Sequence, residues 1–231
     1  MTTLLWLVLP YLAVAVFVLG HVWRWRYDQF GWTTFSTQLV DNRLLRLGSP
    51  LFHLGVLAVL VGHLVGLLVP RSWTAAIGVS DALFHLVSVT AGTLAGVAML
   101  AGLVLLAARR ILHGRIRATT TVMDVVMYVM LGMVVLLGVW ATVAVNLLGA
   151  GHDYRATVAV WFRGIFLLRP DPSLMAGAPL LFQLHALAAL GLFAIWPFTR
   201  LVHVWSVPIA VLWQPSPDRQ RTAELAREVT R

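Results

Sequence analysis

The chain has 231 residues, of which 60% are hydrophobic and only 11% are charged, and its mean hydropathy is +0.86. About a quarter of the residues of an ordinary soluble domain are charged, so the composition excludes that class and indicates a membrane protein. Cysteine is absent, which excludes disulfides, cysteine-ligated iron–sulfur clusters and covalently attached c-type haem.

Five stretches are long and apolar enough to cross a bilayer, since a helical span needs about 20 residues. They are residues 4–22, 51–69, 82–108, 122–148 and 179–205. The first run has no basic residue before it and no small-residue cleavage pattern, so we expect a first helix and not a cleaved signal peptide. The sequence predicts an all-α polytopic membrane protein with one five-helix bundle over 1–205, followed by a tail over 206–231.

The net charge of +8 comes from 17 arginines without any lysine. Thirteen of the arginines lie in segments 23–50 and 109–121 or after residue 199, and the other side of the bundle holds only Arg71, Arg155, Arg163 and Arg169. Because positive loops stay in the cytoplasm, this distribution predicts an external N-terminus and a cytoplasmic tail. Arginines placed between apolar runs also argue against a nucleic-acid partner.

Four histidines lie inside the predicted spans: His53 and His63 in the second, His185 and His203 in the fifth. Ionisable groups are costly inside a bilayer, which makes these residues candidates for a functional site. The two spans run in opposite directions, so His53 matches His203 in depth and His63 matches His185. On an ideal helix, the 18-residue spacing puts His185 and His203 on one face, and the ten-residue spacing puts His53 and His63 on neighbouring faces.

Two imidazole pairs at matched depths predict two haems with histidine axial ligands, and the lack of cysteine makes them b-type. Zinc fits less well because each layer offers two histidines without a nearby acid or thiol, and a proton relay would normally include Asp or Glu. Gly55, Gly62 and Gly66 are expected to leave room for a flat macrocycle; for Gly62 and Gly66 the alternative is a GxxxG helix-packing contact. Pro197 is expected to kink the fifth span.

Three motifs are characteristic: LFHLGVLAVLVGHLVGLL at 51–68, FQLH at 182–185 and WPFTRLVHVWSVP at 196–208. With these motifs the chain resembles the membrane cytochrome b subunit, or gamma subunit, of respiratory nitrate reductase, and the resemblance extends to segments 25–32, 115–121 and 154–166. It implies five helices with the N-terminus outside and two non-covalent b haems. The proximal haem would be held by His53 and His203, and the distal haem by His63 and His185.

The resemblance also implies a role in the cytoplasmic membrane of a prokaryote. Quinol, as menaquinol or ubiquinol, would be oxidised near the outer haem, and its electrons would pass through the inner haem to a cytoplasmic iron–sulfur beta subunit. A molybdenum-containing alpha subunit would then reduce nitrate. The iron–sulfur clusters and the molybdenum cofactor are assigned to these partners because the chain has no cysteine and no sizeable soluble domain. The tail over 206–231 is expected to contact a partner.

Better-known members of this family carry a lysine in the segment leading into the third span, whereas this chain has His85 there. Imidazoles titrate near neutral pH, so we expect His85 to bind quinol or accept its proton; the alternative is an ordinary residue at the membrane interface. The resemblance places Gly62 in the same quinol site. Arg117 is either a contact of a haem propionate or a positive anchor at the inner face.

Further expectations concern the loops. Thr121 and Asp124 have the spacing of a capping box at the start of the fourth span. Trp161 lies in a segment expected to form a short interfacial helix, or to belong to an aromatic belt, and His113 and His152 are expected to be solvated. Two other functions stay open: a cytochrome b subunit of another quinone-linked enzyme, such as a hydrogenase or sulfur-compound reductase, and a haem-free anchor or transporter.

Overall fold

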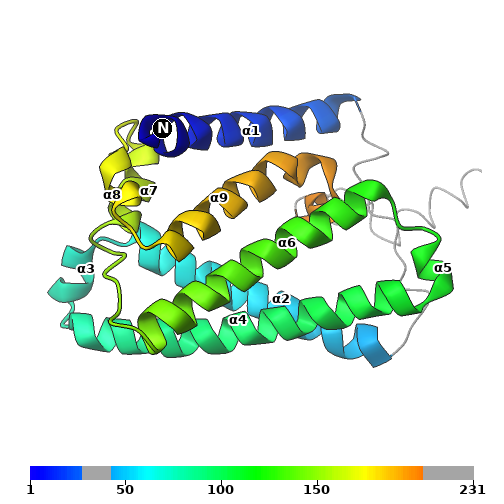
Figure 1. Ribbon diagram of the computed structural model, residues 1–231, viewed down its shortest axis with the longest axis horizontal. Coiled ribbons are helices and arrows are strands. Elements are labelled where there is room, and N and C mark those ends of the chain that lie inside the picture. The colour runs from blue at the N-terminus through cyan, green and yellow to red at the C-terminus, as the bar shows by residue number, and fades with distance from the viewer. Residues whose placement is uncertain (28–42, 205–231) are drawn as a thin grey trace, which may run out of the picture.

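The computed structural model describes residues 1–27 and 43–204, and within these ranges the chain forms helices and no strands (Figure 1). Five helical segments are long and apolar enough to cross a membrane: Leu4–Tyr27, Arg43–Leu68, Asp81–Leu112, Val122–Leu147 and Leu180–Phe198. This confirms the predicted all-α fold with five spans. The predicted cytoplasmic tail lies outside the described residues.

The spans are built on five long helices: α1 (Leu9–Tyr27), α2 (Arg43–His63), α4 (Asp81–Leu112), α6 (Val122–Trp140) and α9 (Leu180–Ile195). Wider π-helical turns lengthen three of them, at Leu4–Val8, Leu64–Leu68 and Ala141–Leu147. The short helices α3 (Arg71–Ala76), α7 (Val158–Phe166) and α8 (Pro172–Ala176) lie at one end of the bundle, and α5 (Gly114–Arg117) lies at the other (Figure 1). We call these the α3 end and the α5 end.

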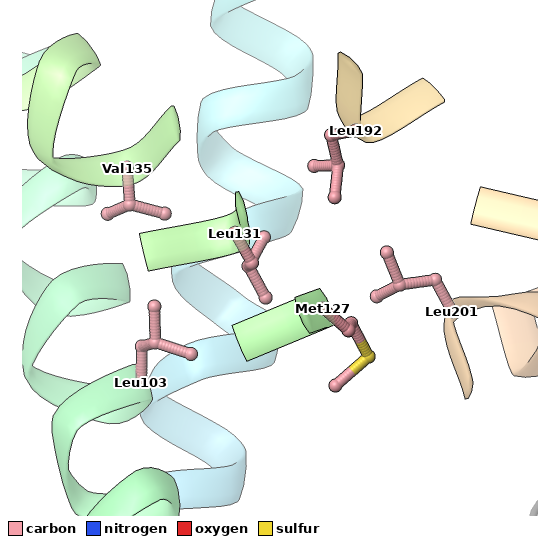
Figure 2. Close-up of a cluster of buried hydrophobic side chains, with 6 residues drawn as sticks. All are labelled: Leu103, Met127, Leu131, Val135, Leu192 and Leu201. Carbon is pink, nitrogen blue, oxygen red and sulfur yellow. The ribbon is translucent and has the colours of Figure 1, made fainter. Parts of the chain in front are cut away.

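The long helices pack in the order α1, α9, α6, α4 and α2, each against the next (Figure 1). A cluster of buried side chains joins α4, α6, α9 and the segment that follows α9; Figure 2 shows its members, Leu103, Met127, Leu131, Val135, Leu192 and Leu201. Lipid tails are as apolar as leucine, so inside a bilayer such a cluster stabilises the bundle through close packing.

Glycines bring α2 and α4 into close contact. A Cβ atom at Gly55 would lie 2.7 Å from the backbone nitrogen of Met99, and one at Gly102 would lie 2.4 Å from the backbone nitrogen of Phe52. Neither position accepts a side chain unless the helices separate. Gly55 was expected to leave room for a macrocycle, but in the structure it serves the close packing of α2 against α4.

The fifth span differs from the continuous helix expected over 179–205. The α-helix ends at Ile195, residues Trp196–Phe198 form a 3-10 turn, Thr199 is extended with φ −114° and ψ 175°, and a second 3-10 turn covers Arg200–Val202. Pro197 has no N–H to continue the helical hydrogen bonds, so the kink expected there is realised as a break. The ideal-helix spacing that placed His185 and His203 on one face therefore does not apply to this span.

A buried carboxylate fastens the segment after the break to the bundle. Asp124 is 3% exposed and forms the predicted capping box with Thr121 at the start of α6. Its Oδ2 atom accepts a hydrogen bond from Nη2 of Arg200 at 3.1 Å and lies 3.4 Å from Nη1 of Arg110 on α4. One carboxylate thus ties together α4, α6 and the chain beyond α9.

Tryptophans form a second cluster at the α3 end. Trp6 and Trp161 meet edge to face with ring centroids 5.7 Å apart, and Nε1 of Trp161 donates a hydrogen bond to the carbonyl oxygen of Trp6 at 2.7 Å. Ile165 and Met175 complete the cluster. The short helix expected around Trp161 is confirmed as α7, but this side chain is only 3% exposed and therefore does not belong to an interfacial aromatic belt.

Candidate functional site

The structure brings together two pairs of histidine side chains across the bundle. The ring centroids of His53 and His203 are 6.2 Å apart, and those of His63 and His185 are 6.1 Å apart. α2 supplies one member of each pair, while α9 and the segment after it supply the others. These are the two pairs expected from depth, the first toward the α5 end and the second toward the α3 end.

Each of the four imidazoles is oriented by a backbone carbonyl that lies within hydrogen-bond distance of its Nδ1 atom. The partners are Ser49 for His53 (2.8 Å), Val59 for His63 (2.8 Å), Val134 for His185 (3.0 Å) and Arg200 for His203 (2.6 Å). When Nδ1 donates to a carbonyl, the lone pair of the ring lies on Nε2. Histidines that bind metals are commonly held in this way.

The separation within each pair fits axial ligation of one iron. A metal–imidazole bond is about 2 Å long, and the ring centre lies about 1 Å beyond the nitrogen, so two imidazoles on opposite sides of one iron have centroids about 6 Å apart. Among the described residues, no group of three or more His, Asp or Glu side chains is placed to hold a metal ion by itself. The donor set therefore suits a haem, whose porphyrin supplies the other ligands.

Two glycines adjoin the pair at the α3 end. A Cβ atom at Gly138 on α6 would lie 2.9 Å from Cε1 of His185, so this ring occupies space that any other residue would fill. A Cβ atom at Gly62 would meet no described atom within 4 Å. The side of α2 next to His63 is therefore open.

A pocket of about 400 Å³ also lies at the α3 end. It is formed by the first turns of α4 and by the segment that follows α6, and its lining residues are Asp81, Ala82, Phe84, His85, Ser88, Ala150, Gly151, His152, Asp153, Tyr154 and Arg155. His85, the expected quinol-site residue, is among them; Gly62 is not. Gly151 has a φ of +80°, and a Cβ atom there would lie 3.7 Å from Nε2 of His85. Glycine thus permits the turn and keeps space open beside the imidazole.

Tyr154 connects the pocket to α2. A Cβ atom at Gly66 would lie 2.8 Å from the hydroxyl oxygen of Tyr154, so the phenol occupies the space beside this glycine, three residues after His63. Burial raises the pKa of the Tyr154 hydroxyl. Gly66 therefore makes room for a tyrosine side chain and not for a neighbouring helix, as a GxxxG contact would require.

His152 is half-buried, so the expectation of a solvated side chain holds only in part. Its Nε2 atom lies 2.9 Å from Oγ1 of Thr157, its ring packs against Phe182 with centroids 5.3 Å apart, and burial lowers its pKa. Burial therefore favours the neutral form of this imidazole. Arg117 is exposed at the end of α5, and its contact with a haem propionate stays a prediction.

Charged side chains surround the mouth of the pocket. Arg71 forms ion pairs with Asp81 and, at 3.0 Å, with Asp153, and the hydrogen bond to Asp81 raises the pKa of Arg71. Sequence reasoning overlooked these residues and Arg155, although Arg71 and Arg155 are two of the four arginines on their side of the bundle. Because arginines are scarce on this side of the bundle, their presence there could have marked Arg71 and Arg155 as candidate functional residues.

The fold and the site together define a five-span helical membrane protein with two histidine pairs, one toward each end of the bundle. The family model described as nitrate reductase gamma subunit matches residues 2–219. The chain belongs to the nitrate reductase gamma subunit family.

Several curated proteins are similar to the chain. It is 48% identical over 216 residues to a nitrate reductase-like protein, NarX, of Mycobacterium tuberculosis, a match that covers 93% of the chain and 33% of that protein. Its identity to the nitrate reductase gamma chain of Bacillus subtilis is 44%, and the match covers 90% of the chain and 93% of that protein. Its identity to the respiratory nitrate reductase 1 gamma chain of Escherichia coli is 33%, and the match covers 88% of the chain and 90% of that protein. The chain thus spans about a third of the mycobacterial relative and most of the other two.

Proposed function

We propose that the chain is the membrane dihaem cytochrome b subunit of a respiratory nitrate reductase in a prokaryotic cytoplasmic membrane. The observation that carries the proposal is the presence of two imidazole pairs, in which each ring has its Nδ1 atom on a carbonyl and the centroid of its partner ring about 6 Å away. His53 and His203 would hold the proximal haem, and His63 and His185 the distal haem. When bound, the two haems would supply one-electron redox chemistry between the two membrane faces.

The chain's own residues would bind quinol and remove its protons at the α3 end. In this proposal His85 accepts a proton from a quinol hydroxyl in the pocket that it lines. Gly62 does not line this pocket, so its assignment to the quinol site rests on the family resemblance alone. The arginine distribution supports an external α3 end, from which protons would leave outward.

The partners would dock at the α5 end. An iron–sulfur beta subunit would take electrons there and deliver them to a molybdenum-containing alpha subunit for nitrate reduction. Arg117 is proposed as a propionate contact near this end. Family membership supports these partners, because the Escherichia coli and Bacillus subtilis relatives are named as gamma chains of nitrate reductases.

Optical spectra of the copurified complex test the cytochrome assignment. Reduced-minus-oxidised difference spectra should show two b-type haems per chain, and changing His53 and His63 together to alanine should remove both, because each haem loses an axial ligand. His113→Ala, which alters a histidine outside both pairs, should keep both haems. A wild-type complex without a b-type band would refute the proposal.

A metal inventory of the same preparation tests the assignment to nitrate reductase. Molybdenum and non-haem iron should copurify with the haems and with quinol-dependent nitrate reduction. Two b haems without molybdenum would instead support a different quinone-linked oxidoreductase.

A further inference from the structure

Arg155 is a buried cation whose hydrogen bonds are only partly satisfied. The residue is 6% exposed. Its guanidinium carbon lies 3.8 Å from the centroid of the Phe84 ring, and Nη2 donates a hydrogen bond to Oγ1 of Thr74 at 2.8 Å. The Nε and Nη1 atoms are buried and have no hydrogen-bond partner among the described residues.

The nearby carboxylates do not satisfy these two nitrogens. Oδ1 of Asp81 lies 4.0 Å from Nη1 of Arg155, beyond hydrogen-bond range, while Oδ2 of Asp81 is paired with Arg71. Oδ2 of Asp153 accepts a hydrogen bond from Arg71, and Oδ1 of Asp153 accepts one from the backbone N–H of Arg155. A buried charged donor without an acceptor is strongly unfavourable, so the arrangement is suited to a ligand that brings an acceptor.

The pocket defines the chemistry of that ligand. Phe84 and Asp81, which flank the guanidinium, both line the pocket, and so do His85 and Tyr154. Its volume of about 400 Å³ falls within the range of small-molecule sites, which is about 300–1,000 Å³. Aromatic walls, a cationic donor and an imidazole together fit a planar ring that carries a hydroxyl oxygen.

We propose that Arg155 is a substrate-binding residue that donates hydrogen bonds from Nε and Nη1 to a hydroxyl oxygen of the quinol, an inference that rests on the proposed function. The O–H bond of the quinol breaks, an N–H bond forms on His85, and the negative charge left on the oxygen is stabilised by the guanidinium. The other titratable and charged groups facing this site are Arg71, Asp81, His152, Asp153 and Tyr154.

Substitutions in the intact complex test the proposal. Arg155→Gln removes the charge, Arg155→Lys keeps it without the planar donor fork, and Arg169→Gln is the matched control because Arg169 is an exposed arginine on the same side that does not line the pocket. The loss of a charged hydrogen bond predicts a KM for a quinol analogue raised at least about tenfold in Arg155→Gln, with a smaller rise in Arg155→Lys. The haem content and nitrate reduction driven by a viologen donor should match the control.

The pH profile separates substrate binding from a purely structural role. Without the positive charge, the quinol hydroxyl is harder to deprotonate, so the rising limb of quinol oxidation should move to higher pH in Arg155→Gln and keep its position in Arg155→Lys. If the wild type oxidises quinol while Arg155→Gln keeps the KM and pH profile of Arg169→Gln, the role of Arg155 is refuted and the proposed function stands. If the wild type has no b haem and oxidises no quinol, both are refuted.

A measurement on the unaltered complex covers the case in which Arg155→Gln does not fold. A photoreactive azidoquinone should label the peptides that contain residues 81–88 or 150–155, and excess quinone should suppress the labelling. Competable labelling confined to other segments would overturn the proposal.

Discussion

At the residue scale, the surroundings of each imidazole determine the direction in which its Nε2 atom points. Gly138 has no Cβ and therefore lets the ring of His185 lie against α6, where its Nδ1 reaches the carbonyl oxygen of Val134 at 3.0 Å. The carbonyl belongs to α6 and the ring to α9, so packing between these two helices sets the direction in which Nε2 points.

Gly138→Ala is expected to displace this ring. The new Cβ would lie 2.9 Å from Cε1 of His185, and overpacking of this kind costs about 1–3 kcal/mol. Thermal unfolding should show the loss, and the b-type spectrum of the proposed distal haem should change while the proximal spectrum is retained. Gly114→Ala, where a Cβ would meet no described atom within 4 Å, is the control and should not lower stability. Equal behaviour of the two variants would contradict this account.

The sequence alone predicted the two histidine pairs because helical rise and span direction determine depth. It did not predict the unsatisfied guanidinium of Arg155. The contacts of that residue with Thr74 and Phe84 join segments that are far apart in the chain, and no local pattern specifies them. The partial burial of His152 was missed for the same reason, since Phe182, the ring that packs against it, belongs to a span 30 residues further along the chain.

At the element scale, the break after α9 and the buried Asp124 together position His203. The break turns the chain so that His203 faces His53, and Arg200 contributes twice: its guanidinium binds Asp124, and its carbonyl oxygen lies 2.6 Å from Nδ1 of His203. The sequence predicted a kink at Pro197 but not the extended residue Thr199, because the conformation there depends on what the next turn binds.

Asp124→Asn should weaken the attachment of the segment after α9 to the bundle and lower the stability of the protein. Removal of one partner from a buried ion pair costs about 3–5 kcal/mol, and Asp124 has a side-chain exposure of only 4% with two arginine partners. Unfolding of the purified protein in detergent, followed by circular dichroism, should show a clearly lower midpoint. Asp171→Asn is the matched control: it alters the exposed cap of α8, where asparagine caps as well as aspartate, and the midpoint should hardly change. Similar midpoints for both variants would contradict the proposed importance of the pair.

At the scale of the whole molecule, the fold follows from composition with few further assumptions. Five apolar runs of sufficient length predicted five spans, and the structure confirms them with ends that differ by several residues. The packing order α1, α9, α6, α4 and α2 was not predictable, since lipid-facing and helix-facing positions in such apolar runs carry nearly the same residue types.

The orientation in the membrane is open to a direct test because the chain contains no cysteine. Single cysteines at position 169, by Arg169→Cys, and at position 114, by Gly114→Cys, would mark the α3 end and the α5 end. A membrane-impermeant maleimide should label the first in intact cells and the second only after the membrane is opened, because arginine-rich loops stay inside. The reverse pattern would place the N-terminus in the cytoplasm.

The break between Ile195 and Arg200 has a consequence for how the protein matures. The pair His63 and His185 lies on helical segments that precede the break, and it can form once the spans assemble. The pair His53 and His203 also needs the chain beyond Thr199 to be seated on Asp124. The two pairs are therefore expected to form in order during biogenesis: the pair toward the α3 end forms first, and the pair toward the α5 end forms last.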